Sequence, residues 1–143
     1  MRNLYLDIDG VLLGKNDPDD FKIVLAKGAA DFLKFCIGSF QCYWLTTHCN
    51  DADNASIVSL LRQYADESVM RLVPLIRSTR WKTFKTEAID FNSDFYWLED
   101  QLLTYEKEIL EKNNVIDRWI KVDTRKEPGD LIRVAALLKK RIN

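Results

Sequence analysis

The sequence predicts an α/β fold in which a mostly parallel sheet of about five strands carries helices on both faces. Two observations lead to this prediction. Short apolar segments with strand character alternate along the chain with segments in helical spacing, and the first strand-like segment, residues 3–8, is apolar on both faces. Strands of that kind are typical of the interior of a parallel sheet.

Length and composition limit the kind of protein that this chain can be. It has 143 residues, of which 47% are hydrophobic and 11% aromatic. We therefore expect one folded domain over residues 1–143 and not a disordered chain. The formal charge of −1, from 22 acidic and 21 basic residues, argues against a chain that coats a polyanion or a membrane surface as a whole.

The apolar runs and the cysteines predict the location. No apolar run approaches the ~20 residues that span a bilayer, and the chain enters a strand-like segment at once, so we expect neither a membrane span nor a secretory leader. The cysteines Cys36, Cys42 and Cys49 are odd in number and form no Cys-x-x-Cys pair. They indicate reduced thiols in or near the core of a cytoplasmic protein.

The first elements show the alternation clearly. After the strand at residues 3–8, the Gly-, Asp- and Pro-containing residues 11–25 predict a loop or small flap. Helical spacing of apolar residues predicts a helix over residues 29–37. A second buried strand follows at residues 42–45, and residues 51–64 form a helix that begins with Asp and Asn cap candidates.

The same alternation continues to the end of the chain. In order, we expect a short strand at 71–76, one or two helical turns at 83–89, a strand at 95–98, a helix at 102–112, a strand at 119–122 and a helix at 128–140. These elements predict a three-layer, Rossmann-like α/β fold.

Polar side chains follow three of the predicted strands at the point where each strand ends. They are Asp7 and Asp9, then Thr46 and Thr47, then Glu99 and Asp100. In open parallel sheets, ligands bind outside the carboxyl ends of the strands, at the topological switch point. We therefore expect these side chains to share one rim and to form the site.

The stretch Asp7-Ile8-Asp9-Gly10 is the most informative part of that rim. An extended strand sends residues i and i+2 to the same side, so Asp7 and Asp9 can face one point. Carboxylates that close repel each other unless a cation lies between them, and Gly10 allows a tight turn beside a ligand. The pattern suits a Mg²⁺-assisted reaction with one aspartate as nucleophile, although a buried strand that runs into an acidic turn would look the same.

The remaining rim residues supply what phosphoryl transfer needs. Rim carboxylates would hold Mg²⁺, and a hydroxyl at Thr46 or Thr47 can hydrogen-bond a phosphoryl oxygen. A lysine is needed to balance the acidic cluster, and both Lys82 and Lys85 precede the strand at 95–98.

This set of motifs, in this order, resembles the haloacid dehalogenase superfamily over essentially the whole chain. The four matching segments are Asp7-Ile8-Asp9-Gly10-Val11, Trp44-Leu45-Thr46, Lys85-Thr86-Glu87-Ala88-Ile89 and Tyr96-Trp97-Leu98-Glu99-Asp100. The first and fourth segments are specific, whereas the second and third gain weight from their order. The pair Glu99-Asp100 departs from the commoner double aspartate of the family.

The resemblance implies a role for each of these residues. Asp7 would attack phosphorus and form an aspartyl-phosphate, and Asp9 would protonate the leaving group, activate water and help to bind Mg²⁺ through its backbone carbonyl. Thr46 would hold the phosphoryl group and Lys85 would balance charge. Glu99 and Asp100 would complete the metal site. A proton-donating second aspartate favours a phosphatase or phosphotransferase over a dehalogenase.

These motifs do not identify the substrate. The intervals after the first and second motifs leave no room for the cap domain that usually selects substrates in the family, so the flap at 12–25 is the only visible gate. An open site suits a macromolecular phosphorylated substrate, such as a nucleic-acid end or a protein, or needs an oligomeric partner as lid. Two alternatives to a general phosphatase therefore remain, a nucleic-acid end phosphatase of the RNA- or DNA-repair type and a non-catalytic module that binds a phosphate group or a partner.

Three further features have two interpretations each. His48, the only histidine, either reaches the site or has a structural role. The basic residues around Trp81 and Phe84 can form a surface for single-stranded nucleic acid, but a solvated loop is the interpretation we prefer, because no known binding motif accompanies them. For Asp123 we expect a loop-capping role before Pro128.

Overall fold

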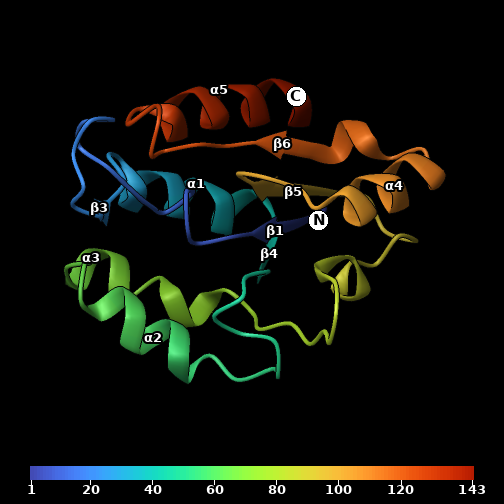
Figure 1. Ribbon diagram of the computed structural model, residues 1–143, viewed down its shortest axis with the longest axis horizontal. Coiled ribbons are helices and arrows are strands. Elements are labelled where there is room, and N and C mark those ends of the chain that lie inside the picture. Colours follow the sequence, from blue (N-terminus) through green and yellow to red (C-terminus); the bar gives the residue numbers. More distant parts are fainter.

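The computed structural model describes residues 1–143 and is built around a four-stranded parallel sheet (Figure 1). Its strands are β1 (Asn3–Leu6), β4 (Gln41–Trp44), β5 (Phe95–Glu99) and β6 (Trp119–Lys121). They lie in the order β4-β1-β5-β6, and every pairing is parallel. The α/β fold with a parallel sheet is confirmed.

Alternation along the strands divides the core between the two faces of the sheet. Leu4 and Leu6 belong to the larger apolar cluster, to which α1 (Ala29–Ser39), α2 (Ala55–Arg62), α3 (Glu67–Met70) and α5 (Asp130–Ile142) also contribute. Tyr5, between them, belongs to a smaller cluster with Trp97 and with Leu110 of α4 (Thr104–Lys112). Helices therefore lie on both faces, and the sheet is the middle of three layers, as the sequence predicts.

The prediction of a strand at residues 71–76 is wrong. This segment continues from α3 into a short 3-10 helix, η1 (Val73–Leu75), and only Arg77 reaches the sheet, where it forms an isolated parallel bridge with Tyr43. Pro74 supplies the physical reason, because proline has no N–H to donate to a strand ladder and its fixed φ suits a helical turn. The sheet consequently has four strands and not five.

The predicted flap is a small antiparallel ribbon formed by β2 (Leu13–Gly14) and β3 (Val24–Leu25). Thr124, just beyond β6, ties this ribbon to the sheet: its N–H donates to Gly10 O at 2.9 Å, its hydroxyl donates to Val11 O at 3.0 Å, and its carbonyl accepts from Lys15 N at 3.1 Å. The ribbon is the only insertion between β1 and α1, so this interval holds no cap domain, as expected.

The other helical predictions agree with the structure apart from their ends. The turns expected at 83–89 form a 3-10 helix, η2 (Lys85–Ala88), and another, η3 (Ile116–Arg118), leads into β6. All three cysteines are buried and unpaired. Among the helices, none has the length and apolar character that crossing a membrane requires.

The close packing of Gly14 against Thr124 yields a test of how the ribbon is anchored. A Cβ at Gly14 would collide with the Thr124 hydroxyl, its Cβ and its backbone carbonyl, so Gly14→Ala should lower the free energy of unfolding by about 1–3 kcal/mol. Gly38→Ala is the matched control: Gly38 lies in α1 with open space around it, and alanine there should stabilise the helix by about 0.5–1 kcal/mol. Urea denaturation measures both, and an unchanged stability of Gly14→Ala would contradict the anchoring.

Candidate functional site

The order of the strands places a switch point between β1 and β5. From β1 the chain goes to β4 on one side, and it then returns to β5 on the other side of β1. Consecutive crossovers that leave a strand in opposite directions open a crevice at its carboxyl end, where ligands bind in such sheets. Asp7 follows β1 directly, Glu99 is the last residue of β5, and Asp100 comes next.

The register of β1 and β5 sets Asp7 and Glu99 side by side. Tyr5 pairs with Trp97 and Leu6 with Leu98, and the ladder continues with Asp7 N donating to Leu98 O at 3.1 Å. Since side chains alternate, Asp7 and Glu99 point to the same face as Tyr5 and Trp97. The sequence predicted the shared rim, and this register explains the shared face.

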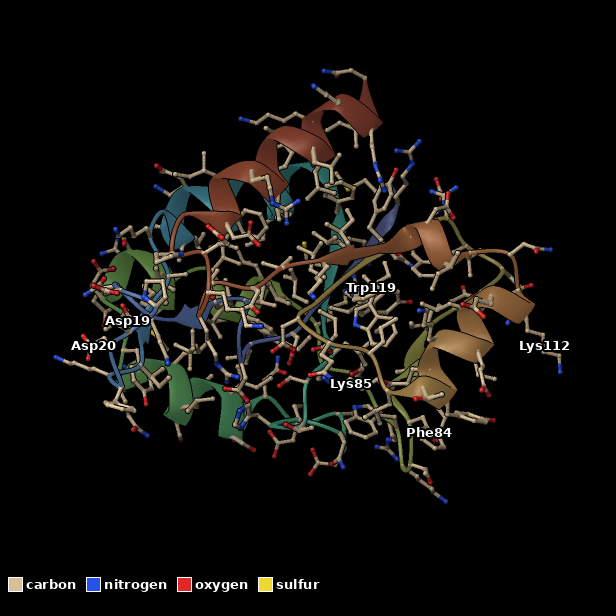
Figure 2. All side chains as sticks on the ribbon, turned by 45° about the horizontal axis from the view of Figure 1, so that its top comes forward. Asp19, Asp20, Phe84, Lys85, Lys112 and Trp119 are labelled. Carbon is tan, nitrogen blue, oxygen red and sulfur yellow. The ribbon has the colours of Figure 1, made fainter.

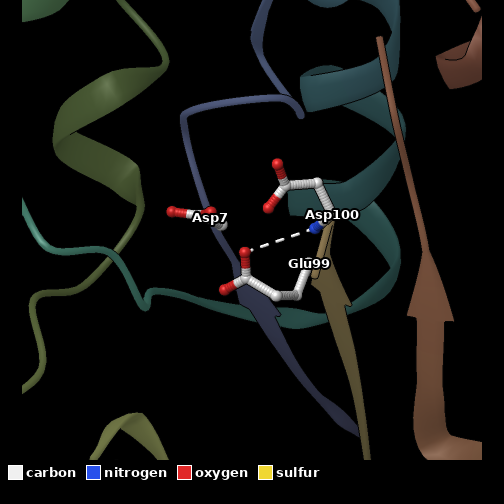
Figure 3. A group of neighbouring side chains, drawn as sticks. All are labelled: Asp7, Glu99 and Asp100. Carbon is white, nitrogen blue, oxygen red and sulfur yellow. Dashed lines mark hydrogen bonds between the residues drawn. The ribbon is translucent and has the colours of Figure 1, made fainter. Parts of the chain in front are cut away.

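Asp7, Glu99 and Asp100 form a compact group of carboxylates (Figure 3). One oxygen from each lies within 4.8 Å of the others. Asp7 and Glu99 are buried, Asp100 is half-buried, and the Asp100 amide donates to Glu99 Oε1 at 3.2 Å. Gly10 packs against this group with φ +76°, and a Cβ there would lie only 2.6 Å from Asp100 Oδ2.

Lys85, which is labelled in Figure 2, is the lysine of this group, and Lys82 is not. Its Nζ lies 2.6 Å from Glu99 Oε2 and 3.5 Å from Asp7 Oδ1, and its side chain is only 12% exposed. Lys82 is exposed and makes no ion pair. The lysine enters from η2, which contacts α4 on the same face of the sheet as the two carboxylates.

A buried glutamate that the sequence analysis missed holds Lys85 in place. Glu106 of α4 accepts a hydrogen bond from Lys85 N at 3.2 Å and another from Leu103 N at 3.0 Å. The second bond is half of a capping box, in which the side chain of a glutamate at the third helical position accepts a hydrogen bond from the backbone N–H of the residue that precedes the helix. In the sequence, the glutamate of this motif is present at the right spacing, but the capping position before it holds Leu103 in place of the usual Ser or Thr, so the motif was incomplete.

Asp9 does not belong to the group of three carboxylates and pairs with His48. The expectation that Asp7 and Asp9 face one point assumed an extended strand through residue 9, whereas β1 ends at Leu6. Asp9 Oδ2 is 2.7 Å from His48 Nε2, and both side chains are partly exposed. His48 thus contacts one of the predicted rim residues, Asp9, and its role in the site stays a prediction. Metal binding by the Asp9 backbone carbonyl stays a prediction.

Thr46 is fully buried, whereas Thr47 is exposed. The Thr46 hydroxyl oxygen accepts from His48 N at 3.3 Å, which leaves its own O–H to donate. Thr47 lines a cavity of about 250 Å³ together with Lys85 and Glu106. No contact links Thr46 directly to Asp7 or Lys85 within hydrogen-bond distance, so its phosphate-binding role also stays a prediction.

The electrostatics of the group favour a cation. Burial raises the pKa of the Glu99 carboxyl, the adjacent Asp7 raises it further, and Lys85 opposes that shift. Burial alone would lower the pKa of Lys85, but Asp7 and Glu99 outweigh it and the pKa is raised. The group thus has three carboxylates, two of them in contact with one buried ammonium, and an ionised group would keep an excess of negative charge that a divalent cation could balance.

The donor set fits Mg²⁺. All three side chains offer carboxylate oxygens, which are the ligands that this hard cation prefers, and one or two carboxylates with waters are its usual protein ligands. No histidine or cysteine belongs to the group, which argues against a zinc site.

The other predicted residues lie as follows. Asp123 caps its loop, since Oδ1 accepts from Arg125 N and Lys126 N, each at 3.1 Å.

In the basic and aromatic segment, Phe84 stacks on Tyr105 with ring centroids 4.2 Å apart. The basic residues of that segment other than Lys85 are exposed: Arg71, Arg77, Arg80 and Lys82.

Comparisons of the chain with protein-family models, with curated proteins and with solved structures give no match.

The carboxylate group predicts that Mg²⁺ stabilises the protein. With the ion at about tenfold its Kd, binding to the folded state alone should raise the melting temperature by about 3–6 °C. Asp100→Asn removes one ligand from the group and should abolish most of that shift. Asp117→Asn, at an exposed aspartate outside the site, should keep it. Equal shifts in the two variants would argue against this metal site.

The buried position of Lys85 predicts a large cost for removing its charge. Lys85→Met leaves Asp7 and Glu99 without their cation, and breaking a buried pair in this way typically costs about 3–5 kcal/mol. Lys82→Met changes an exposed lysine three residues away and should leave stability unchanged. Denaturant unfolding in the absence of metal compares the two, and similar stabilities would contradict the ion-pair account.

Proposed function

We propose that this chain is a Mg²⁺-dependent phosphatase that hydrolyses phosphoric monoesters through an aspartyl-phosphate on Asp7. The observation that carries the proposal is the position of Asp7 at the switch point, with Lys85 Nζ at 3.5 Å and the carboxylates of Glu99 and Asp100 around it. The motif order that resembles the haloacid dehalogenase superfamily supports the same reaction.

Asp7, Glu99 and Asp100 are the side chains that would hold the metal ion. When bound, Mg²⁺ would neutralise charge on the phosphoryl oxygens and orient the phosphate.

Asp7 acts as the nucleophile in this proposal. Its carboxylate attacks phosphorus, the bond to the ester oxygen breaks, and the phosphoryl group becomes bound to Asp7. Lys85 contacts Asp7 Oδ1 and Glu99 Oε2 together, so it fixes the direction of the nucleophile through an ion pair. Glu106 in turn fixes the backbone of Lys85.

Asp9 transfers protons. It protonates the leaving oxygen in the first step and removes a proton from the attacking water in the second, which returns Asp7 as a free carboxylate and releases phosphate. His48, hydrogen-bonded to Asp9 Oδ2, orients that carboxyl group. The O–H of Thr46 donates to a phosphoryl oxygen, since its oxygen already accepts from the backbone.

The cytoplasm is the compartment we propose for this activity. Three buried, unpaired cysteines are compatible with a reducing environment, where thiols remain free.

The role of Asp7 gives the first test. Asp7→Asn keeps the size of the side chain but lacks a nucleophilic oxygen, so turnover of 4-nitrophenyl phosphate should fall by roughly three orders of magnitude or more. Circular dichroism should show an unchanged fold. Glu108→Gln, at an exposed carboxylate of α4, should retain full activity. Undiminished turnover by Asp7→Asn would remove the mechanism.

The role of Asp9 gives a second test that depends on the leaving group. Alkyl alcohols are poor leaving groups and need a proton, whereas 4-nitrophenolate leaves readily without one. Asp9→Asn should therefore slow the hydrolysis of an alkyl phosphate by about 10²–10⁴-fold. With the aryl ester, the same change should lower the rate of phosphoenzyme formation much less. Pre-steady-state release of the two alcohols measures this difference. An equal loss for both esters would count against Asp9 as the proton donor.

A further inference from the structure

A polar cavity of about 580 Å³ adjoins the carboxylate group on the side of Asp100. No hydrophobic side chain lines it, and its residues come from the ribbon segment, from the end of β5 and from the region around the end of β6. Its charged lining residues are Lys15, Asp100, Lys121, Asp123, Arg125 and Lys126. We call this space the basic cavity.

Cations dominate the basic cavity although the chain as a whole has a charge of −1. Its four basic side chains face two carboxylates, and both carboxylates are engaged. Asp123 accepts from two backbone amides, and Asp100 belongs to the candidate metal group. The cavity therefore has an excess of positive charge beside a strongly acidic site.

Most of these cations have no partner within the fold. Lys15, Lys121 and Lys126 form no ion pair, and the Arg125 guanidinium makes no hydrogen bond within the protein. The nearest partner of Arg125 is Asp100, with Nη1 3.9 Å from Oδ2. Three lysines without an ion-pair partner and one loosely paired arginine thus converge on one hollow from the ribbon and from residues 121–126, an arrangement suited to an anionic ligand.

We propose that the basic cavity binds a second phosphate group of the substrate, one that is not transferred. This inference rests on the proposed phosphatase function and deepens it, since it assigns the substrate to the class of molecules with two or more phosphate groups. A guanidinium with several ammonium groups matches the charge and the multiple acceptor oxygens of a phosphate better than those of a single carboxylate. Asp100, which borders both sites, would lie between the two phosphates.

A second cavity beside the basic cavity leaves room for more than a single phosphate. A neighbouring cavity of about 460 Å³ shares Lys121, Asp123 and Lys126 with the basic cavity and continues along β6 and α5. The second phosphate can thus belong to a small bisphosphate or to the backbone of a phosphorylated nucleotide chain. The chemistry at the basic cavity is the same for the two sources.

The first experiment compares substrates with one and two phosphates. For the wild-type protein with Mg²⁺, kcat/KM for adenosine 3′,5′-bisphosphate should exceed that for either adenosine monophosphate by about tenfold or more. The triple variant Lys15→Gln, Lys121→Gln, Lys126→Gln should lose this preference but keep its turnover of 4-nitrophenyl phosphate. Arg125 is left unchanged because it contacts Asp100.

A matched triple variant controls for the change in net charge. Lys34→Gln, Lys107→Gln, Lys112→Gln removes three exposed lysines from α1 and α4, away from the basic cavity, and should keep the preference. A 3′- or 5′-phosphorylated oligonucleotide then distinguishes the sources. A further gain of about tenfold over the bisphosphate would identify a nucleotide chain, and no gain would identify a small bisphosphate.

A binding measurement separates this inference from the proposed function. Calorimetric titration of the Asp7→Asn protein with the bisphosphate and with each monophosphate, in the presence of Mg²⁺, does not depend on turnover. Tighter binding of the bisphosphate, lost in the cavity triple variant and kept in the control, would support the inference even if no ester is hydrolysed. Equal binding of the three nucleotides, or an unchanged preference in the cavity variant, would overturn it and leave the phosphatase proposal standing on its own tests.

Discussion

The ion pair of Lys85 with Glu99 and Asp7 is the interaction on which the candidate site depends. Parallel pairing of β1 with β5 forces two buried carboxylates onto one face at the carboxyl edge of the sheet, where their charges repel. Lys85 offsets this repulsion from a segment that belongs to neither strand, and Glu106 holds the backbone of that segment. Without the lysine, the buried carboxyl groups of Asp7 and Glu99 would lose the cation that opposes the rise of the Glu99 pKa. The rest of the site, with Asp100 in the acidic group and Asp9 paired to His48, is arranged around this pair.

An open rim has consequences for how such a site could select a substrate. No cap covers the carboxyl edge of the sheet, and the ribbon that replaces a cap is fastened to Thr124 beyond β6. In the proposed phosphatase, selection would then come from side chains around the rim itself. The acidic group and the basic cavity lie next to each other there and share Asp100. A negative and a positive surface are thus neighbours at this rim, although the chain as a whole is nearly neutral. A substrate with two phosphate groups would complement this arrangement, with one phosphate near a metal ion at the acidic group and the other in the basic cavity.

Sequence reasoning predicted the alternation of strands and helices and the carboxylates at strand ends, because burial and side-chain periodicity are local properties. It did not predict that residues 71–76 leave the sheet, although Pro74 was the local signal that it should have weighed. The choice between Lys82 and Lys85 depends on how η2 docks against α4, which no local pattern contains. The partners Asp9 and His48 are 39 residues apart, and the cavity around Arg125 joins distant segments, so both became visible only in three dimensions.

The most direct test of the central claim is to identify the residue that carries the phosphoryl group. Acid quenching of the protein during turnover of an aryl phosphate, followed by borohydride reduction, converts an aspartyl-phosphate to homoserine, and peptide mass analysis then locates that residue. The account predicts homoserine at position 7, formed only when substrate and Mg²⁺ are both present. A phosphoryl group on any other residue, or turnover with no modification at Asp7, would contradict it.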